Sequence, residues 1–333
     1  MFYLFISGTE ISKVPGLSAA GANPDVIPLT SPADADVIRF GFPEAVDCFP
    51  MDPEGHPTPA IITRAAEVES GMPICVVRAG TYLPPAPPYV ETGASFGRNP
   101  GIEPSVPDAK KIYERSRHFA ENAASSQKFV MLAESIPGGT TTALLTLRAL
   151  GIEGMVSSGG PNNPISLKEK IWSAASGRIG IKKGGLADDP FRAVTEMGDP
   201  MQASVLGFIA GLRAGIEVVL AGGTQMIAVA ALLSRLQPSF PKPLIATTKY
   251  VAEDKSSNFQ ELASALGLET HIAQIDFSKS PHKGLSDYEK GYVKEGVGAG
   301  GATLYAERLG VPLSRVLERT NAIYAQVVGQ NVA

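Results

Sequence analysis

The sequence predicts an α/β fold: a doubly wound, mostly parallel sheet with helices on both faces, in three layers, with a small accessory helical part. Three observations support this prediction. Short, fully apolar runs are typical of strands buried on both faces, amphipathic stretches of helical period follow them, and glycines and prolines mark the junctions. Alternating strands and helices imply right-handed crossovers and a parallel sheet. We interpret the 333 residues as a single domain, 1–333, with its core at about 60–310.

Apolar runs give the predicted strands. The run 128–133 is short and apolar throughout, as expected of a strand inside a parallel sheet. The run 1–8 lacks a basic leader and is too short for a signal peptide, so we interpret it as a buried first strand. The predicted strands are 1–8, 74–78, 128–133, 217–221, 244–248 and 271–276.

Helices are predicted between these runs, which gives a Rossmann-like arrangement. Asp199 and Pro200 have the residue types of an N-cap and a first helical position. Behind them Met201, Val205 and Leu212 form one apolar stripe. The other predicted helices are 60–70, 140–150, 168–175, 224–236, 256–266 and 286–309.

The segment 83–107 is rich in proline and glycine and is predicted to be a long loop. Long loops in compact domains are usually lids, binding loops or linkers. The residues leave two interpretations open, a loop over the site and a plain linker.

Composition argues against several classes of function. The net charge is −4, and no basic stripe is interleaved with aromatic residues, so a nucleic-acid surface is not expected. Cys48 and Cys75 have no metal-binding spacing and fit a reducing cytosol. The longest apolar stretch, 208–220, is broken by Arg213 and Glu217, so no membrane span is expected.

Two glycine turns sit between a predicted strand and a predicted helix. They are Gly138-Gly139-Thr140 and Gly222-Gly223-Thr224. Glycines let backbone amides approach an anion, and a helix start adds partial positive charge. A lone Gly-Gly turn is a weak signal and by itself favours a tight turn with a threonine cap. Together they favour a site for a phosphorylated ligand at one edge of the sheet.

Two further segments could carry chemistry. Glu295 lies inside the glycine-rich run 292–303, where it is either solvated beside a tightly packed helix or held in a narrow cleft as a general base. The segment 157–164 leads to Lys168 and Lys170, which either pair with a phosphate or are solvated.

At these residues the chain resembles the nicotinate-nucleotide–dimethylbenzimidazole phosphoribosyltransferase family, which makes the lower-ligand nucleotide of cobalamin, and it is most similar to a divergent branch. The family's Gly-Glu-Met-Gly-Ile-Gly-Asn-Thr-Thr loop is similar to 133–141. Its Gly-Glu-Gly-Thr-Gly-Ala element, with the catalytic glutamate, is similar to 294–299. Its Asp-Ile-Ala-Ala-Leu-Ala-Gly-Phe helix and following strand resemble 199–221, and its Gly-Thr-Gly segment with a phosphate-binding lysine resembles 158–170. The motifs occur in the family's order over roughly 128–310.

The resemblance implies a pentosyltransferase that moves the 5-phosphoribosyl group of nicotinate mononucleotide to an aromatic base and releases nicotinate. It makes Glu295 the general base and Glu134 a residue that orients the base or the ribose. Thr248, Lys249 and Tyr250 correspond to the base pocket. It further implies a cytoplasmic homodimer acting on small molecules, with no metal and no cofactor. The implied phosphate- and ribose-binding residues are Gly138, Gly139, Thr140, Gly160, Lys170, Gly222 and Gly223.

The chain also departs from the family. The family's Lys-Pro-Pro-Gly-Ser-Leu-Gly entry is missing, and its Ser-His-x-Ser-Ala-Glu-Pro-Gly-His segment appears here as 247–255. Those regions shape the base pocket in the family, so dimethylbenzimidazole itself is not implied as the acceptor. The alternative is a non-catalytic protein of the same fold that binds a nucleotide or a cobamide precursor.

Overall fold

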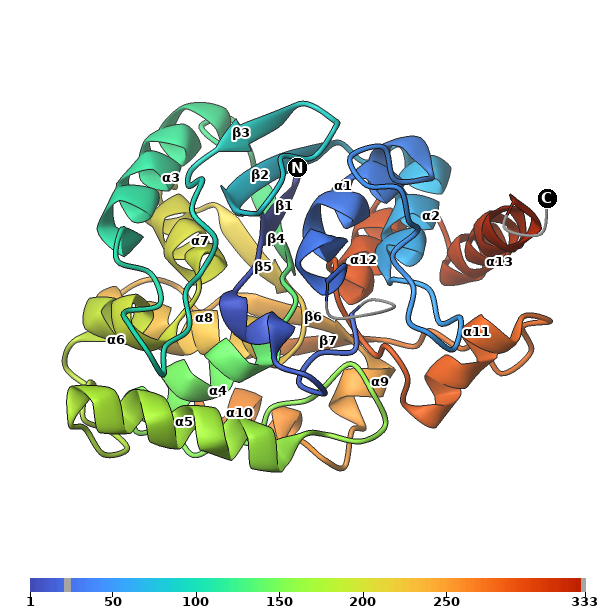
Figure 1. Ribbon diagram of the computed structural model, residues 1–333. Helices are drawn as coiled ribbons and strands as arrows, with labels where there is room; N and C mark the ends of the chain where they lie inside the picture. The colour runs from blue at the N-terminus through green and yellow to red at the C-terminus, as the bar shows by residue number, and fades with distance from the viewer. Residues whose placement is uncertain (21–24, 331–333) are drawn as a thin grey trace.

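A seven-stranded sheet runs through the middle of the molecule in the computed structural model, which describes residues 1–20 and 25–330 (Figure 1). Every strand pair is parallel, and the order across the sheet is β3-β2-β1-β4-β5-β6-β7. This confirms the predicted doubly wound parallel sheet. The strands are β1 (Phe2–Ser7), β2 (Ile74–Gly80), β3 (Tyr89–Glu91), β4 (Phe129–Ser135), β5 (Glu217–Ala221), β6 (Leu244–Thr248) and β7 (Thr270–Ala273).

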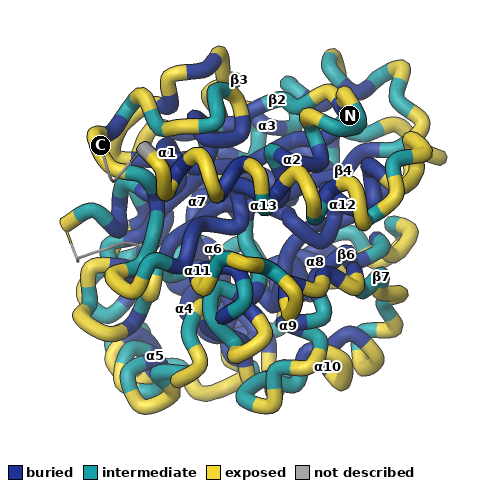
Figure 2. Tube along the Cα trace, turned by 90° about the vertical axis from the view of Figure 1, so that its right-hand side faces the viewer, coloured by how far each residue is buried: buried dark blue, intermediate teal, exposed yellow. Residues whose placement is uncertain are grey.

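The strands are apolar on both faces because helices cover both faces. In β1, Phe2 and Leu4 point into one hydrophobic core, and Tyr3 and Phe5 point into the other. This alternation follows from the period of two residues in a strand. Figure 2 shows the result, with buried chain gathered in the middle and exposed positions on the outer helices and loops.

Two layers of helices sandwich the sheet (Figure 1). One core joins the sheet to α1 (Thr30–Phe40), α2 (Ala60–Ser70), α12 (Ala299–Arg308) and α13 (Leu313–Gln330). The other joins it to α3 (Ala109–Ala123), α4 (Gly139–Ala149), α6 (Pro190–Met197), α7 (Pro200–Ala210) and α8 (Thr224–Leu236). The other helices are α5 (Ile165–Ile179), α9 (Lys249–Ala252), α10 (Phe259–Ala265) and α11 (Lys283–Ser286), with 3-10 turns η1 (Glu10–Lys13), η2 (Ile27–Leu29) and η3 (Asp287–Lys290).

Most predicted elements are present, and the main exception is the helix predicted at 286–309. The chain there forms η3, then an irregular segment at 291–298, and then α12. Gly291 and Gly298 take left-handed φ values of 86° and 65°, which end one helical element and precede the next. The predicted strand at 271–276 is also shorter, since β7 ends at Ala273. The segment 83–107, predicted to be a loop, contains the short strand β3 at the edge of the sheet.

Close packing of α12 on the sheet depends on glycine. A Cβ placed on Gly301 would lie 2.3 Å from the Cβ of Ala221 in β5 and 2.9 Å from the Sδ of Met131 in β4. Neither distance is compatible with normal van der Waals contact, and the surrounding core is fully buried. The glycine therefore sets how closely this helix approaches the strands.

We predict that Gly301→Ala lowers the free energy of unfolding by roughly 1–3 kcal/mol, because the added methyl group overpacks the core. Gly177 in α5 is a matched control, since a Cβ there meets nothing within 4 Å. Gly177→Ala should leave stability unchanged or raise it by up to about 1 kcal/mol. Chemical denaturation of both variants measures the difference, and equal midpoints would contradict the packing argument.

Candidate active site

A cavity lies where the strand order of the sheet reverses. β1 and β4 are neighbours, but the chain leaves β1 toward one edge of the sheet and leaves β4 toward the other. In open α/β sheets ligands bind at the carboxyl ends of the strands at such a point. The cavity has a volume of about 140 Å³. It is lined by residues 17–20, 50–52, 56–59, 134–140, 157–159, 223–225 and 293–297, with Thr30, Asp34 and Val251.

Both glycine turns reach this cavity. Gly138 has a left-handed φ of 82°, caps α4 and lines the cavity together with Gly139 and Thr140. Gly223 caps α8 and lines the cavity from β5. The amino-terminal ends of two helices therefore meet one space, and each end carries a partial positive charge. This arrangement favours an anionic group.

Glu295 borders the cavity from the segment 291–298. Its Oε2 accepts hydrogen bonds from the amide of Thr248 at 2.9 Å and from the amide of Gly300 at 3.3 Å. Its Oε1 accepts one from the amide of Gly296 at 3.2 Å. Burial raises the pKa of Glu295 to about 7, although these amide donors act in the opposite direction. A carboxyl group with this pKa is suited to accept a proton near neutral pH.

Glu134 lies at the end of β4 and lines the same cavity. Its side chain is almost fully buried, and within the described chain its Oε1 has no hydrogen-bond partner. Burial, and then the charges of Glu295, Asp199 and Asp34, raise its pKa well above the usual value. This environment favours the protonated carboxyl group, which can donate a hydrogen bond to a ligand.

Asp34, on α1, is a third carboxyl group at the cavity, and the sequence analysis missed it. Thr58 Oγ1 donates to its Oδ1 at 2.7 Å, and Ser135 Oγ donates to its Oδ2 at 2.7 Å. Burial raises its pKa to about 7 despite these two hydrogen bonds. The one indication in the sequence was an acidic residue in a segment, 30–40, whose alanine, valine and isoleucine residues pack on the sheet.

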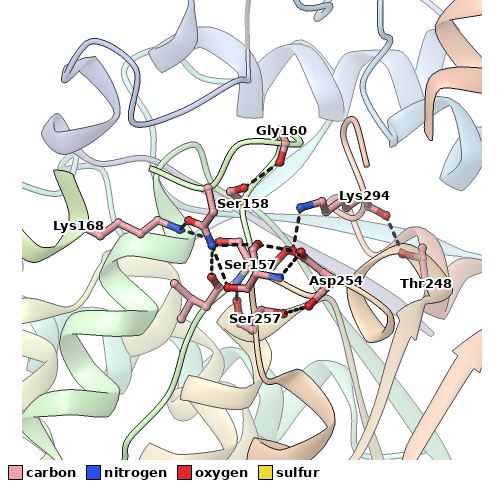
Figure 3. A network of polar contacts seen from close by, with 12 residues as sticks. Ser157, Ser158, Gly160, Lys168, Thr248, Asp254, Ser257 and Lys294 are labelled. Carbon is pink, nitrogen blue, oxygen red and sulfur yellow. Dashed lines mark hydrogen bonds and ion pairs between the residues drawn. The ribbon is translucent and has the colours of Figure 1, made fainter. Parts of the chain in front are cut away.

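Two buried lysines, Lys168 and Lys294, belong to a network of polar contacts that includes the cavity residues Ser157 and Ser158 (Figure 3). Lys168 Nζ donates to the carbonyl oxygen of Ser157 at 2.7 Å and to Oδ1 of Asn163 at 2.8 Å. Burial, followed by the nearby charge of Lys294, lowers its pKa to about 7. Lys294 itself lines the cavity and pairs with Asp254 at 2.7 Å. Sequence analysis did not single out Lys294.

The structure brings together half of the site residues named from the sequence. The ones that line the cavity are Glu134, Gly138, Gly139, Thr140, Gly223 and Glu295. Gly160, Lys170, Gly222, Thr248, Lys249 and Tyr250 are not among the described residues that line it. Gly159 lies there in place of Gly160, and Lys170 is exposed on α5.

The three residues assigned to a base pocket contact other parts of the site. The amide of Thr248 donates to Glu295, as described above. Tyr250 donates its hydroxyl to Glu289 Oε1 at 2.5 Å, and Lys249 pairs with the same carboxylate at 2.9 Å. Thr248 thus joins β6 to the segment that carries Glu295, and Lys249 and Tyr250 join α9 to η3, which precedes that segment.

His56 is a further cavity residue that sequence reasoning did not select. Its ring lies between Asp52 Oδ2 at 2.5 Å and Asp287 Oδ2 at 3.1 Å. It stacks on Tyr292 with a centroid distance of 4.0 Å. Asp52 lies four residues away along the chain, but Asp287 and Tyr292 come from a distant segment, so the sequence did not indicate the whole cluster.

Metal-binding clusters and membrane-spanning helices are both absent from residues 1–20 and 25–330. No group of three or more His, Cys, Asp or Glu side chains there could hold a metal ion. No helix in this part of the chain is long and apolar enough to cross a membrane.

Solved structures define the class of fold. The nicotinate-nucleotide-dimethylbenzimidazole phosphoribosyltransferase from Thermus thermophilus matches with a TM-score of 0.60 over 97% of this chain and 82% of that chain. The sequence identity is 16%, so the likeness shows the fold. This chain therefore has a phosphoribosyltransferase-like α/β fold. The neighbour belongs to the family that the sequence motifs resemble, which confirms that resemblance.

Sequence relatives define the family. No family model matches the chain. A UPF0284 protein from Thermococcus gammatolerans is 48% identical over 98% of this chain and 98% of its own length. A UPF0284 protein from Thermococcus kodakarensis is 46% identical over 99% of this chain and 98% of its own length. The chain belongs to the UPF0284 family.

We predict that Asp34→Asn changes the dependence of stability on pH. The folded pKa of about 7 lies above the ordinary value of 3.8, so the folded state holds this proton more tightly. The stability contributed by Asp34 is therefore full below pH 4 and is lost as pH rises to about 7. Relative to wild type, the neutral asparagine should gain roughly 4 kcal/mol between pH 4 and pH 8. Denaturant midpoints at both pH values measure this, and a constant difference would contradict it.

Proposed function

We propose that this protein is a phosphoribosyltransferase that moves the 5-phosphoribosyl group of nicotinate mononucleotide to an aromatic base and releases nicotinate. The observation that carries the proposal is the meeting of Glu134, Glu295 and two glycine-capped helix starts in one cavity at the switch point of the sheet. The likeness of the fold to a phosphoribosyltransferase from Thermus thermophilus supports it.

The reaction needs few catalytic groups. The bond from C1′ to the pyridinium nitrogen breaks, and its electron pair stays with nitrogen, so nicotinate leaves as a neutral ring without a general acid. A lone pair on a nitrogen of the acceptor base forms the new bond to C1′. The N–H proton of that base then passes to Glu295. Positioning of the two reactants supplies several kcal/mol of the rate acceleration.

The cavity is lined by both polar and apolar residues. The polar ones include Glu134, Glu295 and the glycine turns, and the apolar ones include Leu17, Pro50, Met51, Pro57 and Pro59. Apolar lining residues suit the face of an aromatic ring. In our proposal Glu134 orients the base or the ribose, and the two helix starts hold the phosphate and ribose.

The assignment of Lys170, Gly160 and Gly222 to the phosphate, and of Thr248, Lys249 and Tyr250 to the base, remains a prediction from the family resemblance. So do a homodimer and a place in cobamide lower-ligand synthesis in the cytoplasm. A non-catalytic binding protein of the same fold is the alternative that turnover measurements separate from the enzyme.

We predict that Glu295→Gln slows nicotinate release by roughly 100- to 10,000-fold, because a positioned general base contributes about that much. Purified protein is incubated with nicotinate mononucleotide and a panel of benzimidazoles, adenine and phenols, and nicotinate is measured. Titration with nicotinate mononucleotide checks that the variant still binds. No release by wild type above the variant, across the panel, would end the transferase assignment. Binding without turnover would favour the non-catalytic alternative.

We predict that kcat/KM rises with pH and levels off above about 7. Glu295 accepts a proton only when ionised, and its pKa in the folded protein is about 7. Initial rates between pH 5 and 9 give the profile. Residual activity of Glu295→Gln should not show this transition, and a transition of the same midpoint in the variant would assign the titration to another group.

A further inference from the structure

An unusual backbone conformation places two oppositely charged neighbours in the same cavity. Val293, Lys294 and Val297 have φ values of 64°, 56° and 56°, in the left-handed region that residues other than glycine rarely adopt. Successive side chains of an extended segment point to opposite sides. Here Lys294 and Glu295 both line the cavity. The surroundings hold the strained segment in place, because the amide of Val293 donates to the carbonyl oxygen of Gly159 at 2.7 Å.

Lys294 retains donor capacity in this position. Its ammonium group has three N–H donors, and its side chain is 4% exposed. Among the residues that the structure describes, its Nζ has one hydrogen-bonded acceptor, Oδ2 of Asp254 at 2.7 Å (Figure 3). Two donors therefore stay available to a ligand in the cavity.

The carboxylate of Asp254 accepts hydrogen bonds from residues other than Lys294. Its Oδ2 also accepts from Ser157 Oγ at 2.6 Å, and its Oδ1 accepts from the amide and the hydroxyl of Ser256 at 2.9 and 2.7 Å. Burial raises the pKa of this carboxyl group, but the hydrogen bonds from Lys294, Ser157 and Ser256 outweigh that effect and lower it. Ser157 and Ser256 therefore keep this carboxylate hydrogen-bonded when Lys294 turns toward another anion.

The other nearby lysines fit the role of an anion-binding cation less well. Lys168 already donates hydrogen bonds to Ser157 and Asn163, so it stabilises the loop 157–164 and has less donor capacity for a ligand. Lys170 is exposed on α5. Of the described residues that line the cavity, Lys294 is the one lysine or arginine. Without Lys294, a dianionic ligand there would lie beside several carboxyl groups with no lysine or arginine among the described lining residues.

We propose that Lys294 binds the phosphate monoester of the substrate, and that Asp254 holds the ammonium group beside the cavity until the phosphate arrives. This inference deepens the proposed function and rests on it for the identity of the nucleotide. Phosphate recognition by Lys294 is chemically separate from base transfer by Glu295, so the two can fail independently.

Equilibrium titration tests the inference without any acceptor base present. Nicotinate mononucleotide and nicotinate riboside differ by the phosphate alone, and ribose 5-phosphate and ribose give a second pair. We expect wild type to prefer the phosphorylated member of at least one pair. Lys294→Met should weaken binding of that member by roughly tenfold or more, as loss of a hydrogen bond to a charged group does. Affinity for the unphosphorylated member should change less than threefold.

Asp254→Asn separates phosphate binding from a merely structural ion pair. Removing the competing carboxylate should keep or increase the preference for the phosphorylated member, which is opposite in sign to the effect of Lys294→Met. A structural pair would instead make both variants lose affinity for both members alike. Lys183→Met is the matched control, because Lys183 forms an exposed pair with Glu153. Lys294→Arg, which keeps the charge, should keep most of the preference.

Three outcomes would overturn the inference: a preference that persists in Lys294→Met, parallel losses in Lys294→Met and Asp254→Asn, and no preference of wild type in either pair. Thermal unfolding of each variant verifies that it is folded. If wild type shows the Lys294-dependent preference but releases no nicotinate with any base, the inference stands and the proposed transferase activity fails.

Discussion

The site depends on the close contact between the segment 291–298 and the carboxyl ends of the central strands. The amide of Val297 donates to the carbonyl oxygen of Glu134 at 2.8 Å, and the hydroxyl of Thr248 donates to the carbonyl oxygen of Lys294 at 2.6 Å. These bonds tie an irregular segment to β4 and β6. They also supply the fixed surroundings that a backbone with several left-handed residues requires, since each such residue costs of order 1–3 kcal/mol. This contact holds Lys294 and Glu295 at the cavity.

A second feature of the site is that three carboxyl groups line one cavity. Glu134, Glu295 and Asp34 all have pKa values raised by burial. Each of these carboxyl groups can therefore exchange a proton, or stay protonated, near neutral pH. An exposed carboxyl group would be ionised at that pH. The same burial lowers the negative charge of the cavity and so lowers the repulsion that an anionic ligand would meet there.

The sequence predicted the regular part of the fold closely and the irregular part poorly. The bounds predicted for α2, α8, β5 and β6 agree with the structure, because apolar runs there are closed by glycine, proline or polar residues. The helix predicted at 286–309 was wrong, because propensity does not report that the chain pairs with distant strands at 291–298. Among the longer helices, α1, α3, α6 and α13 were not predicted. In α1 the buried Asp34 and Asp36 hide the apolar face that packs on the sheet.

Site residues in glycine-rich segments could be predicted from the sequence. Site residues defined by long-range contacts could not. Gly138, Gly139 and Glu295 could be selected because glycine-rich turns after strands are local patterns. Lys294 contacts Asp254 and His56 contacts Asp287, and both partners lie far away in the chain, so the sequence did not indicate these contacts. Lys170 was chosen over its neighbours by resemblance, while its exposure on α5 is a property of the folded chain.

The place of β1 in the sheet makes the cavity depend on both halves of the sheet. Phe2 pairs with Ile74 on one side and with Met131 on the other, so β1 joins β2 and β3 to the strands from β4 to β7. The cavity opens at the junction of those halves. A ligand bound there would therefore stabilise the complete sheet, by a free energy that grows with the logarithm of the ligand concentration over its dissociation constant.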